Sequence, residues 1–159
     1  MSLQLEEIEL IRRLKHRYSR GIDSGDMDLV ASLFTEDAEI DYRGGSYHFA
    51  LQGRDVIMEA LSQAFHPRFV GSHTVHMPVI DVHDDGTADG EWTLLDYALD
   101  LDADNRTTVG SATYKDKYRK VDGEWLIARS SYERVYERVY HEPEPGLTAH
   151  LLARTGAAA

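Results

Sequence analysis

Apolar residues recur every three or four positions through the first stretch of the chain, which predicts a helix. This face consists of Ile8, Ile11, Leu14 or Lys15, Tyr18 and Ile22. Acidic residues precede basic ones between Leu5 and Ile22, an order that suits the helix dipole. Ser24-Gly25-Asp26 is expected to end this helix, and Asp26 to cap a second one from Asp28 to Phe34.

The pattern then changes to the alternation of strands. Ala38–Tyr42 and Tyr47–Leu51 are predicted as two strands joined by a turn at Gly44-Gly45. A third helix is expected to open at Gly53-Arg54-Asp55 and to end at His66-Pro67, since the residue before a proline disfavours helix.

The second half of the chain contains only strand and turn patterns. Four strands are predicted at 74–82, 87–101, 109–121 and 124–140, with turns at Asp84-Asp85-Gly86 and Asp122-Gly123. Helices followed by long antiparallel strands indicate an α+β fold. We expect a cone-shaped α+β barrel, in which N-terminal helices pack in a curved, mixed, mostly antiparallel sheet over residues 1–141. Residues 142–159 are expected to form a peripheral tail.

One segment allows two interpretations. Tyr132-Glu133-Arg134-Val135 is repeated as Tyr136-Glu137-Arg138-Val139, so a helix with tyrosines four apart is possible. A strand is favoured because aromatic and β-branched residues fill the segment. A regular strand would place Tyr132, Arg134, Tyr136, Arg138 and Tyr140 on one face.

Composition excludes several classes of protein. The chain has 159 residues, which fits one domain, and its net charge of -11 argues against nucleic-acid or membrane partners. It has no cysteine, and no apolar run approaches the 18 residues of a membrane span. The first residues lack the features of a signal peptide, so a soluble cytoplasmic protein is expected.

The candidate chemistry centres on two histidines, His73 and His76. Extended backbone would place them on opposite faces, so that one points into the cone. A His-x-x-His pair on a strand does not converge on a metal ion, and no metal or cofactor is expected. His73 is expected to precede its strand, after a short irregular segment at 70–72 that lets the imidazole turn inward.

Several other residues are candidates for the same site. Asp23 ends the first predicted helix, and a His–Asp pair can act as a general base with a fixed tautomer. Alternation places Asp96 on the apolar face of its strand, either in the site or already solvated beyond the rim. Trp92 and Tyr114 are expected to line a cavity wall or to serve as ordinary core aromatics.

Three stretches then indicate a family. They are residues 90–96 (GEWTLLD), 114–123 (YKDKYRKVDG) and 132–137 (YERVYE). On these the chain resembles the SnoaL-like family of the nuclear-transport-factor-type cone superfamily, from about Glu6 to about Leu151. Within that family it is most similar to the bile-acid 7α-dehydratases, and it is also similar to scytalone dehydratase and hexachlorocyclohexane dehydrochlorinase.

The resemblance implies roles for particular residues. The catalytic set would be His73, Asp23, Tyr18 and Asp96, and the substrate-binding set would include Tyr42 and Arg134 beside Trp92 and Tyr114. The dehydratases have a pocket tyrosine where this chain has Asn105 or Arg106.

The function implied is a cofactor-independent dehydratase acting on a hydroxysteroid or a polycyclic, polyketide-like substrate. The alternatives are an isomerase or cyclase of the same family, or a domain that binds a small molecule without catalysis. The resemblance also implies a homo-oligomer, a trimer before a dimer. Val135 and Val139, alternating with Glu133 and Glu137, are expected on the outer face that would form this assembly.

Overall fold

The structure is a computed structural model that describes residues 3–152. It contains three helices and six strands. They are α1 (Leu5–Ser24), α2 (Met27–Ser32), β1 (Phe34–Arg43), β2 (His48–Gln52), α3 (Arg54–Ala64), β3 (Phe69–Val82), β4 (Thr87–Asp100), β5 (Arg106–Val121) and β6 (Glu124–His141).

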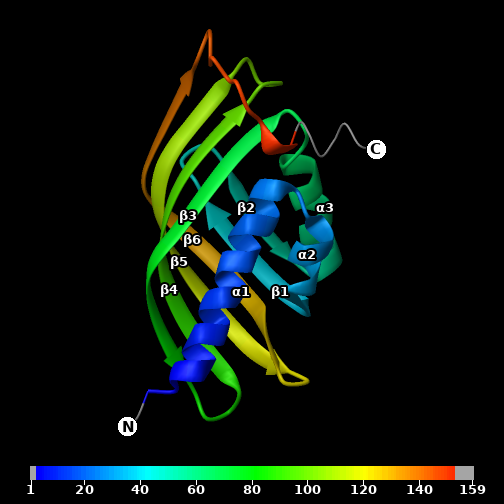
Figure 1. The fold of residues 1–159 in the computed structure, drawn as a ribbon, viewed down its shortest axis with the longest axis vertical. Coiled ribbons are helices and arrows are strands. Elements are labelled where there is room, and N and C mark those ends of the chain that lie inside the picture. The colour runs from blue at the N-terminus through cyan, green and yellow to red at the C-terminus, as the bar shows by residue number, and fades with distance from the viewer. Residues whose placement is uncertain (1–2, 153–159) are drawn as a thin grey trace.

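The strands form one sheet in the order β2-β1-β6-β5-β4-β3. β1 and β6 run parallel, and the other neighbouring pairs run antiparallel. Figure 1 shows the sheet curving around α1, which lies across its concave face, while α2 and α3 lie beside β1 and β2. The predicted α+β cone is confirmed.

The first helix follows the apolar pattern of the sequence. Ile11, Leu14, Tyr18 and Ile22 are all buried against the sheet. Gly25 ends the helix in the left-handed conformation (φ 69°) and donates to the carbonyl oxygen of Ile22, as helix C-caps commonly do.

The short second helix begins one residue earlier than predicted, at Met27, and ends two residues earlier. The carboxylate of Asp26 accepts the backbone N–H of Leu29 at 3.0 Å, so the predicted N-cap is present. The helix stops at Ser32, and Phe34 already belongs to β1.

Strand β3 begins earlier than the sequence suggested. It starts at Phe69, and His73 pairs with Asp96 of β4 within the regular ladder. The expectation of an irregular segment at 70–72 was therefore wrong. The irregularity lies later, where Met77 adopts a positive φ of 50° and the register shifts between His76 and Val79.

The repeated Tyr-Glu-Arg-Val segment is a strand, as favoured, but it is not regular. Arg134 pairs with Ala112 and Tyr136 with Ser111, so Val135 is an extra residue in a β-bulge. The expectation that Tyr132, Arg134, Tyr136, Arg138 and Tyr140 share one face was wrong. Beyond the bulge the faces are exchanged, and Glu137 lies on the same side as Arg134.

An ion pair lies in the core beneath the concave face. Nζ of Lys15 is 2.7 Å from the carboxylate of Asp116, and both side chains are fully buried. The carboxylate also accepts the hydroxyls of Tyr118 and Ser130. Burial lowers the pKa of Lys15, while the charge of Asp116 opposes that shift.

The chain after β6 returns toward α1. The imidazole of His150 is 2.9 Å from the carbonyl oxygen of Phe69, and Leu152 is buried against Gly25. The division into a domain over 1–141 and a tail over 142–159 stays a prediction, and residues 1–2 and 153–159 lie outside the described part. Within residues 3–152, no helix is long and apolar enough to cross a membrane.

Candidate active site

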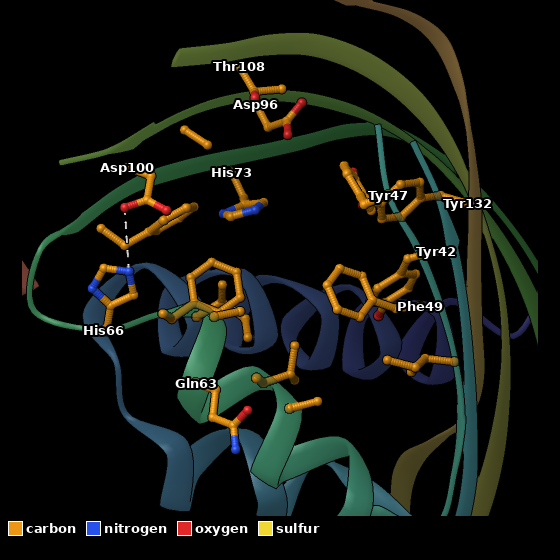
Figure 2. A pocket seen from close by; sticks show the side chains of 18 of the residues that line it. Tyr42, Tyr47, Phe49, Gln63, His66, His73, Asp96, Asp100, Thr108 and Tyr132 are labelled. Carbon is orange, nitrogen blue, oxygen red and sulfur yellow. Dashed lines mark hydrogen bonds and ion pairs between the residues drawn. The ribbon is translucent and has the colours of Figure 1, made fainter. Parts of the chain in front are cut away.

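A cavity of about 330 Å³ lies between the concave face of the sheet and helices α1 and α3. That volume is within the range of small-molecule sites. Most of the wall is apolar, and its largest members are Ile22, Ile40, Phe49, Leu51, Leu61, Phe65 and Phe69. Polar groups on the wall, most of them labelled in Figure 2, are Tyr18, Tyr42, Tyr47, Gln63, His66, His73, Asp96, Asp100, Arg106, Thr108, Tyr114, Tyr132 and Arg134.

His73 is held by Asp23 through two contacts. Oδ1 of Asp23 lies 2.6 Å from Nδ1 of the imidazole, and Oδ2 accepts the backbone N–H of His73 at 2.9 Å. When Nδ1–H donates to the carboxylate, Nε2 holds the free lone pair. The predicted contact between the two side chains is therefore present, and His73 lines the cavity.

Local sequence explains how a helix and a strand can meet at this pair. Asp23 lies in the last turn of α1, and Gly71 lies two residues before His73 on the same face of β3. A Cβ at Gly71 would lie 3.7 Å from Oδ1 of Asp23 and 3.3 Å from the ring of Phe69. The distance to the carboxylate is an ordinary van der Waals contact, so the glycine gives room mainly to the ring of Phe69.

His76 does not belong to the cavity wall. It pairs with Thr93 on the opposite side of the sheet from His73, as extended backbone predicts. Its Nε2 is buried and has no hydrogen-bond partner among residues 3–152.

Tyr18 and Tyr42 form a pair of phenols at the inner end of the cavity. Their hydroxyl oxygens are 3.0 Å apart. Burial raises the pKa of Tyr18 to about 12 and holds the pKa of Tyr42 well above its usual value. Both phenols are therefore neutral near pH 7 and able to donate.

Asp96 and Arg134 form a bidentate ion pair across β4 and β6. Nη1 and Nη2 of Arg134 lie 2.5 and 2.9 Å from the two oxygens of Asp96. Burial is the largest single effect and lowers the pKa of Arg134, but the hydrogen bonds to Asp96 and the charges of Asp96 and the neighbouring tyrosines together raise it above its usual value. The alternative of a solvated Asp96 is wrong, because only 6% of its side chain is exposed.

A second pair of phenols, which the sequence did not indicate, lies beside this ion pair. The hydroxyls of Tyr47 and Tyr132 are hydrogen-bonded to each other, and Nη2 of Arg134 donates to Tyr47 at 2.8 Å. The Tyr132 ring stacks on Tyr42 with centroids 4.6 Å apart, so the two pairs are neighbours.

Two predicted binding residues lie deeper than expected. The ring of Tyr114 lines the cavity and packs against Tyr42. Nζ of Lys15 lies 3.4 Å from the centroid of the Tyr114 ring, a cation–π contact. Trp92 is not among the lining residues; its indole N–H donates to Tyr118 at 3.0 Å. The core interpretation therefore fits Trp92 better than a place in the cavity wall.

The other end of the cavity carries charged groups. His66 and Asp100 approach to 3.6 Å there (Figure 2). Arg106, which also lines the cavity, donates to the hydroxyl of Ser46 at 2.7 Å. In the described range 3–152, no three His, Asp or Glu side chains are grouped as metal ligands.

The arrangement combines one oriented imidazole with neutral phenols in a mostly apolar chamber. Such a site can take a proton from carbon at His73 and give a proton or a hydrogen bond to oxygen at the tyrosines. Sequence reasoning placed Tyr47 at the start of a predicted strand but did not identify it as a site residue, and β2 itself begins only at His48. It placed Tyr132 and Arg134 on one face, but did not identify Tyr132 as a site residue.

Comparisons with solved structures show what the chain is similar to. A protein of Novosphingobium aromaticivorans DSM 12444, provisionally named a scytalone dehydratase, is 26% identical, with a TM-score of 0.75 over 87% of this chain and 90% of that one. A hexachlorocyclohexane dehydrochlorinase of Novosphingobium barchaimii LL02 is 18% identical, with a TM-score of 0.74 over 87% and 95% of the two chains. A type 2 hexachlorocyclohexane dehydrochlorinase is also 18% identical, with a TM-score of 0.77 over 91% and 97%.

The two dehydrochlorinases share the fold at a low level of identity. The sequence itself gives the family, because the SnoaL-like domain matches residues 3–131. That range holds both helical and strand parts of the cone, together with Tyr18, Asp23, His73 and Asp96. The chain belongs to the SnoaL-like family.

Proposed function

We propose that the protein is a cofactor-independent lyase that eliminates water from a hydroxysteroid or a polycyclic, polyketide-like substrate. One observation supports this more than any other: the imidazole of His73, held by Asp23, faces a chamber that also contains neutral phenols. Elimination next to a carbonyl needs a base and an acid a short distance apart in a dry site.

The proposed steps use side chains that line the chamber or support it. A carbonyl in the substrate acidifies a neighbouring C–H, and Nε2 of His73 takes that proton. Tyr18, hydrogen-bonded to Tyr42, protonates the departing hydroxyl, and its raised pKa keeps it in the protonated form beforehand. Asp23 fixes the tautomer and stabilises the imidazolium that forms.

Asp96 and Arg134 are proposed to orient the substrate. Both oxygens of Asp96 accept hydrogen bonds from Arg134, which favours this task over direct help to Tyr18. Tyr42 and Tyr114 would shape the inner end of the chamber together with them. Trp92 would act only by supporting this wall from the core, through Tyr118.

The substrate class is supported by the chamber and by the relatives. Phenylalanines at 49, 65 and 69 line a volume of about 330 Å³, which suits a flat or fused-ring compound with few polar groups. One relative is provisionally named a scytalone dehydratase, and two are hexachlorocyclohexane dehydrochlorinases, so eliminations occur on this fold.

Two alternatives use the same site. An isomerase or cyclase would use His73 for proton transfer without losing water. A domain that only binds a small molecule would use His73 and Asp23 as structural residues.

The experiment begins by extracting the purified protein with organic solvent and identifying the bound compounds by mass spectrometry. A β-hydroxy ketone with the same ring skeleton as the extracted compound is then incubated with the protein in D₂O. A dehydratase yields a product that has lost one water molecule. An isomerase or cyclase incorporates deuterium without that loss, and a binding domain returns the compound unchanged. The last two outcomes would each refute the proposed reaction.

We also propose that the protein is a cytoplasmic homo-oligomer, a trimer before a dimer, formed through the convex face of the sheet. Met77, Val79, Leu95, Val135 and Tyr136 are exposed large side chains of β3, β4 and β6. Glu137 and Val139 are not part of that face, contrary to expectation, because both follow the bulge: Glu137 reaches Arg134, and Val139 pairs with the cavity-lining Thr108. Light scattering that shows a monomer at micromolar concentration would refute the assembly.

A further inference from the structure

The second pair of phenols, Tyr47 and Tyr132, has no part in the steps above. Both side chains line the cavity, and their hydroxyls are hydrogen-bonded to each other. Tyr47 also accepts a hydrogen bond from Nη2 of Arg134. Tyr47, Tyr132 and Arg134 therefore form a hydrogen-bonded polar cluster in a mostly apolar wall. Polar groups in such a wall commonly have a structural or functional role.

One of the two tyrosine O–H groups in this cluster has no acceptor within it. Two hydroxyls have two protons, and their mutual hydrogen bond uses one of them. The contact with Arg134 uses a guanidinium proton, so it satisfies neither of the two. Among residues 3–152, neither hydroxyl has another hydrogen-bond acceptor. Whichever tyrosine donates to the other, one O–H is left available on the cavity wall.

The surroundings make that donor a strong one. Asp96 holds the guanidinium of Arg134 in a bidentate contact, which fixes the hydrogen bond to Tyr47. A charged donor on one hydroxyl polarises the chain of hydrogen bonds beyond it. Burial raises the pKa of both tyrosines, so both remain neutral donors near pH 7.

The same surroundings favour a neutral acceptor over an anion. Arg134 is flanked by two carboxylates, since Glu137 Oε2 lies 3.3 Å from its Nε in addition to the contact with Asp96. The cluster has a formal charge of about -1, which repels a permanent carboxylate or phosphate at this short range. A ketone oxygen has no such charge until the reaction gives it one.

We propose that Tyr47 and Tyr132 form the binding site for a ketone or enone oxygen of the substrate. This rests on the proposed function, because that oxygen would become the enolate oxygen when His73 removes the neighbouring proton. Figure 2 shows the two tyrosines facing the cavity from the side, with His73 across the open space from them. The oxygen and the acidic C–H of one substrate can then meet the two groups together.

The step is balanced in protons and electrons. The C–H bond breaks, its proton goes to Nε2 of His73, and its electron pair moves to the oxygen held by the tyrosines. The electrons then return, the C–OH bond breaks, and the hydroxyl leaves as water with the proton of Tyr18. The proton on His73 replaces that of Tyr18 through solvent. Stabilising the enolate oxygen with a preorganised donor lowers the barrier of the first step.

The first pair of phenols is a poorer candidate for this task. Tyr18 and Tyr42 have hydroxyls 3.0 Å apart, but no cation donates to either hydroxyl among residues 3–152. The two pairs thus have different roles: Tyr18 of the first pair gives a proton to the leaving group, and the second pair, Tyr47 and Tyr132, binds the carbonyl oxygen.

The test uses 1-tetralone, a neutral bicyclic aromatic ketone, and needs no turnover. Binding is measured by titration, and the C=O stretching frequency of the bound ketone by infrared difference spectroscopy. We expect the frequency to fall when the ketone binds. Tyr47→Phe and Tyr132→Phe, made separately, should each reduce that shift and weaken binding by about three- to tenfold, as for one net hydrogen bond.

Tyr136→Phe is the matched control, because Tyr136 has the same place in the repeat as Tyr132 but points away from the cavity and is 47% exposed. It should change neither reading. The inference is wrong if 1-tetralone does not bind, if its bound frequency matches that in an apolar solvent, or if both phenylalanine variants keep the full shift. If the shift depends on the tyrosines but no substrate loses water, the site stands and the proposed reaction fails.

Discussion

Oε2 of Glu137 lies 3.3 Å from Nε of Arg134, although a regular strand would turn residues three apart to opposite faces. The extra residue Val135 exchanges the faces and brings both side chains to the concave side. Gly44 makes room for the ring of Tyr47 and for this carboxylate, since a Cβ there would clash with the ring and lie 2.7 Å from Oε2. The bulge thus brings Arg134 from the first copy of the repeat and Glu137 from the second into one buried ion pair.

Removing the charge of Glu137 should weaken this arrangement. Its side chain is only 7% exposed, and it also accepts a hydrogen bond from Ser46. We expect Glu137→Gln to lower the free energy of unfolding by about 1–3 kcal/mol, because the buried guanidinium of Arg134 loses one of its two carboxylate partners. Urea unfolding followed by circular dichroism measures this change.

Glu133→Gln is the control for that variant, because Glu133 has the same place in the first copy of the repeat and is exposed. Its effect should stay within about 0.5 kcal/mol. Equal losses in the two variants would mean that the contact with Arg134 contributes nothing.

Regular alternation is what allowed the sequence to predict much of the fold and part of the site. β4 keeps its phase throughout, so Trp92, Leu94 and Asp96 all face inward as expected. His73 and Asp23 could be paired because a helix end and an inward strand position converge in this family's fold. Those predictions needed only local periodicity and the family resemblance.

Irregular backbone and long-range contacts set the limit of prediction. Nothing in the repeat shows that Val135 is a bulge, because bulges depend on the partner strand. Likewise, Lys15 occurs on an apolar helix face, and Asp116 follows Tyr114 by two residues on β5. Their ion pair depends on how α1 crosses the sheet, and the local sequence pattern does not predict that crossing.

Removing one partner of the Lys15–Asp116 pair should lower the free energy of unfolding much more than removing both charges together. Lys15→Met leaves a buried carboxylate without its cation, and we expect a loss of about 3–5 kcal/mol in the free energy of unfolding. Lys15→Met combined with Asp116→Asn removes both charges. Tyr118 and Ser130 donate to different oxygens of Asp116, so the amide keeps an acceptor for one hydroxyl and can donate its NH₂ to the other. The double variant should recover much of that loss.

Denaturant unfolding of the two single variants and the double variant forms the cycle that measures this coupling. Lys117→Met is the control, because Lys117 pairs with Asp89 on the exposed face and should matter by less than about 1 kcal/mol. Additive effects of the Lys15 and Asp116 changes would contradict a coupled pair.

High pH should destabilise the protein through its buried tyrosines. Burial raises the pKa of seven of them, which are Tyr18, Tyr42, Tyr47, Tyr97, Tyr114, Tyr118 and Tyr132. Because the folded pKa lies above the unfolded one, their contribution is complete below about pH 10. It is lost as the pH rises, and for Tyr18 this occurs between about pH 10 and about pH 12.

Absorbance at the phenolate band and circular dichroism, recorded together against pH, test this expectation. Most of the phenolate signal should appear only when the fold is lost. Phenolate formation by most of the tyrosines near pH 10, with the fold intact, would show that these hydroxyls are not buried as described.

The last prediction concerns the base. His73 lines the chamber with Nδ1 bound to Asp23, whereas His76 points to the other side of β3, three residues further along the same strand. His73→Ala and Asp23→Asn should each lower turnover by about 10²- to 10⁴-fold, as expected for loss of a general base or its orienting partner. His76→Ala should change turnover by much less, because His76 has no access to the substrate. Turnover is measured on the substrate that the extraction identifies, with circular dichroism to show that each variant is folded. An inactive His76 variant beside an active His73 variant would mean that the base has been assigned to the wrong side of the sheet.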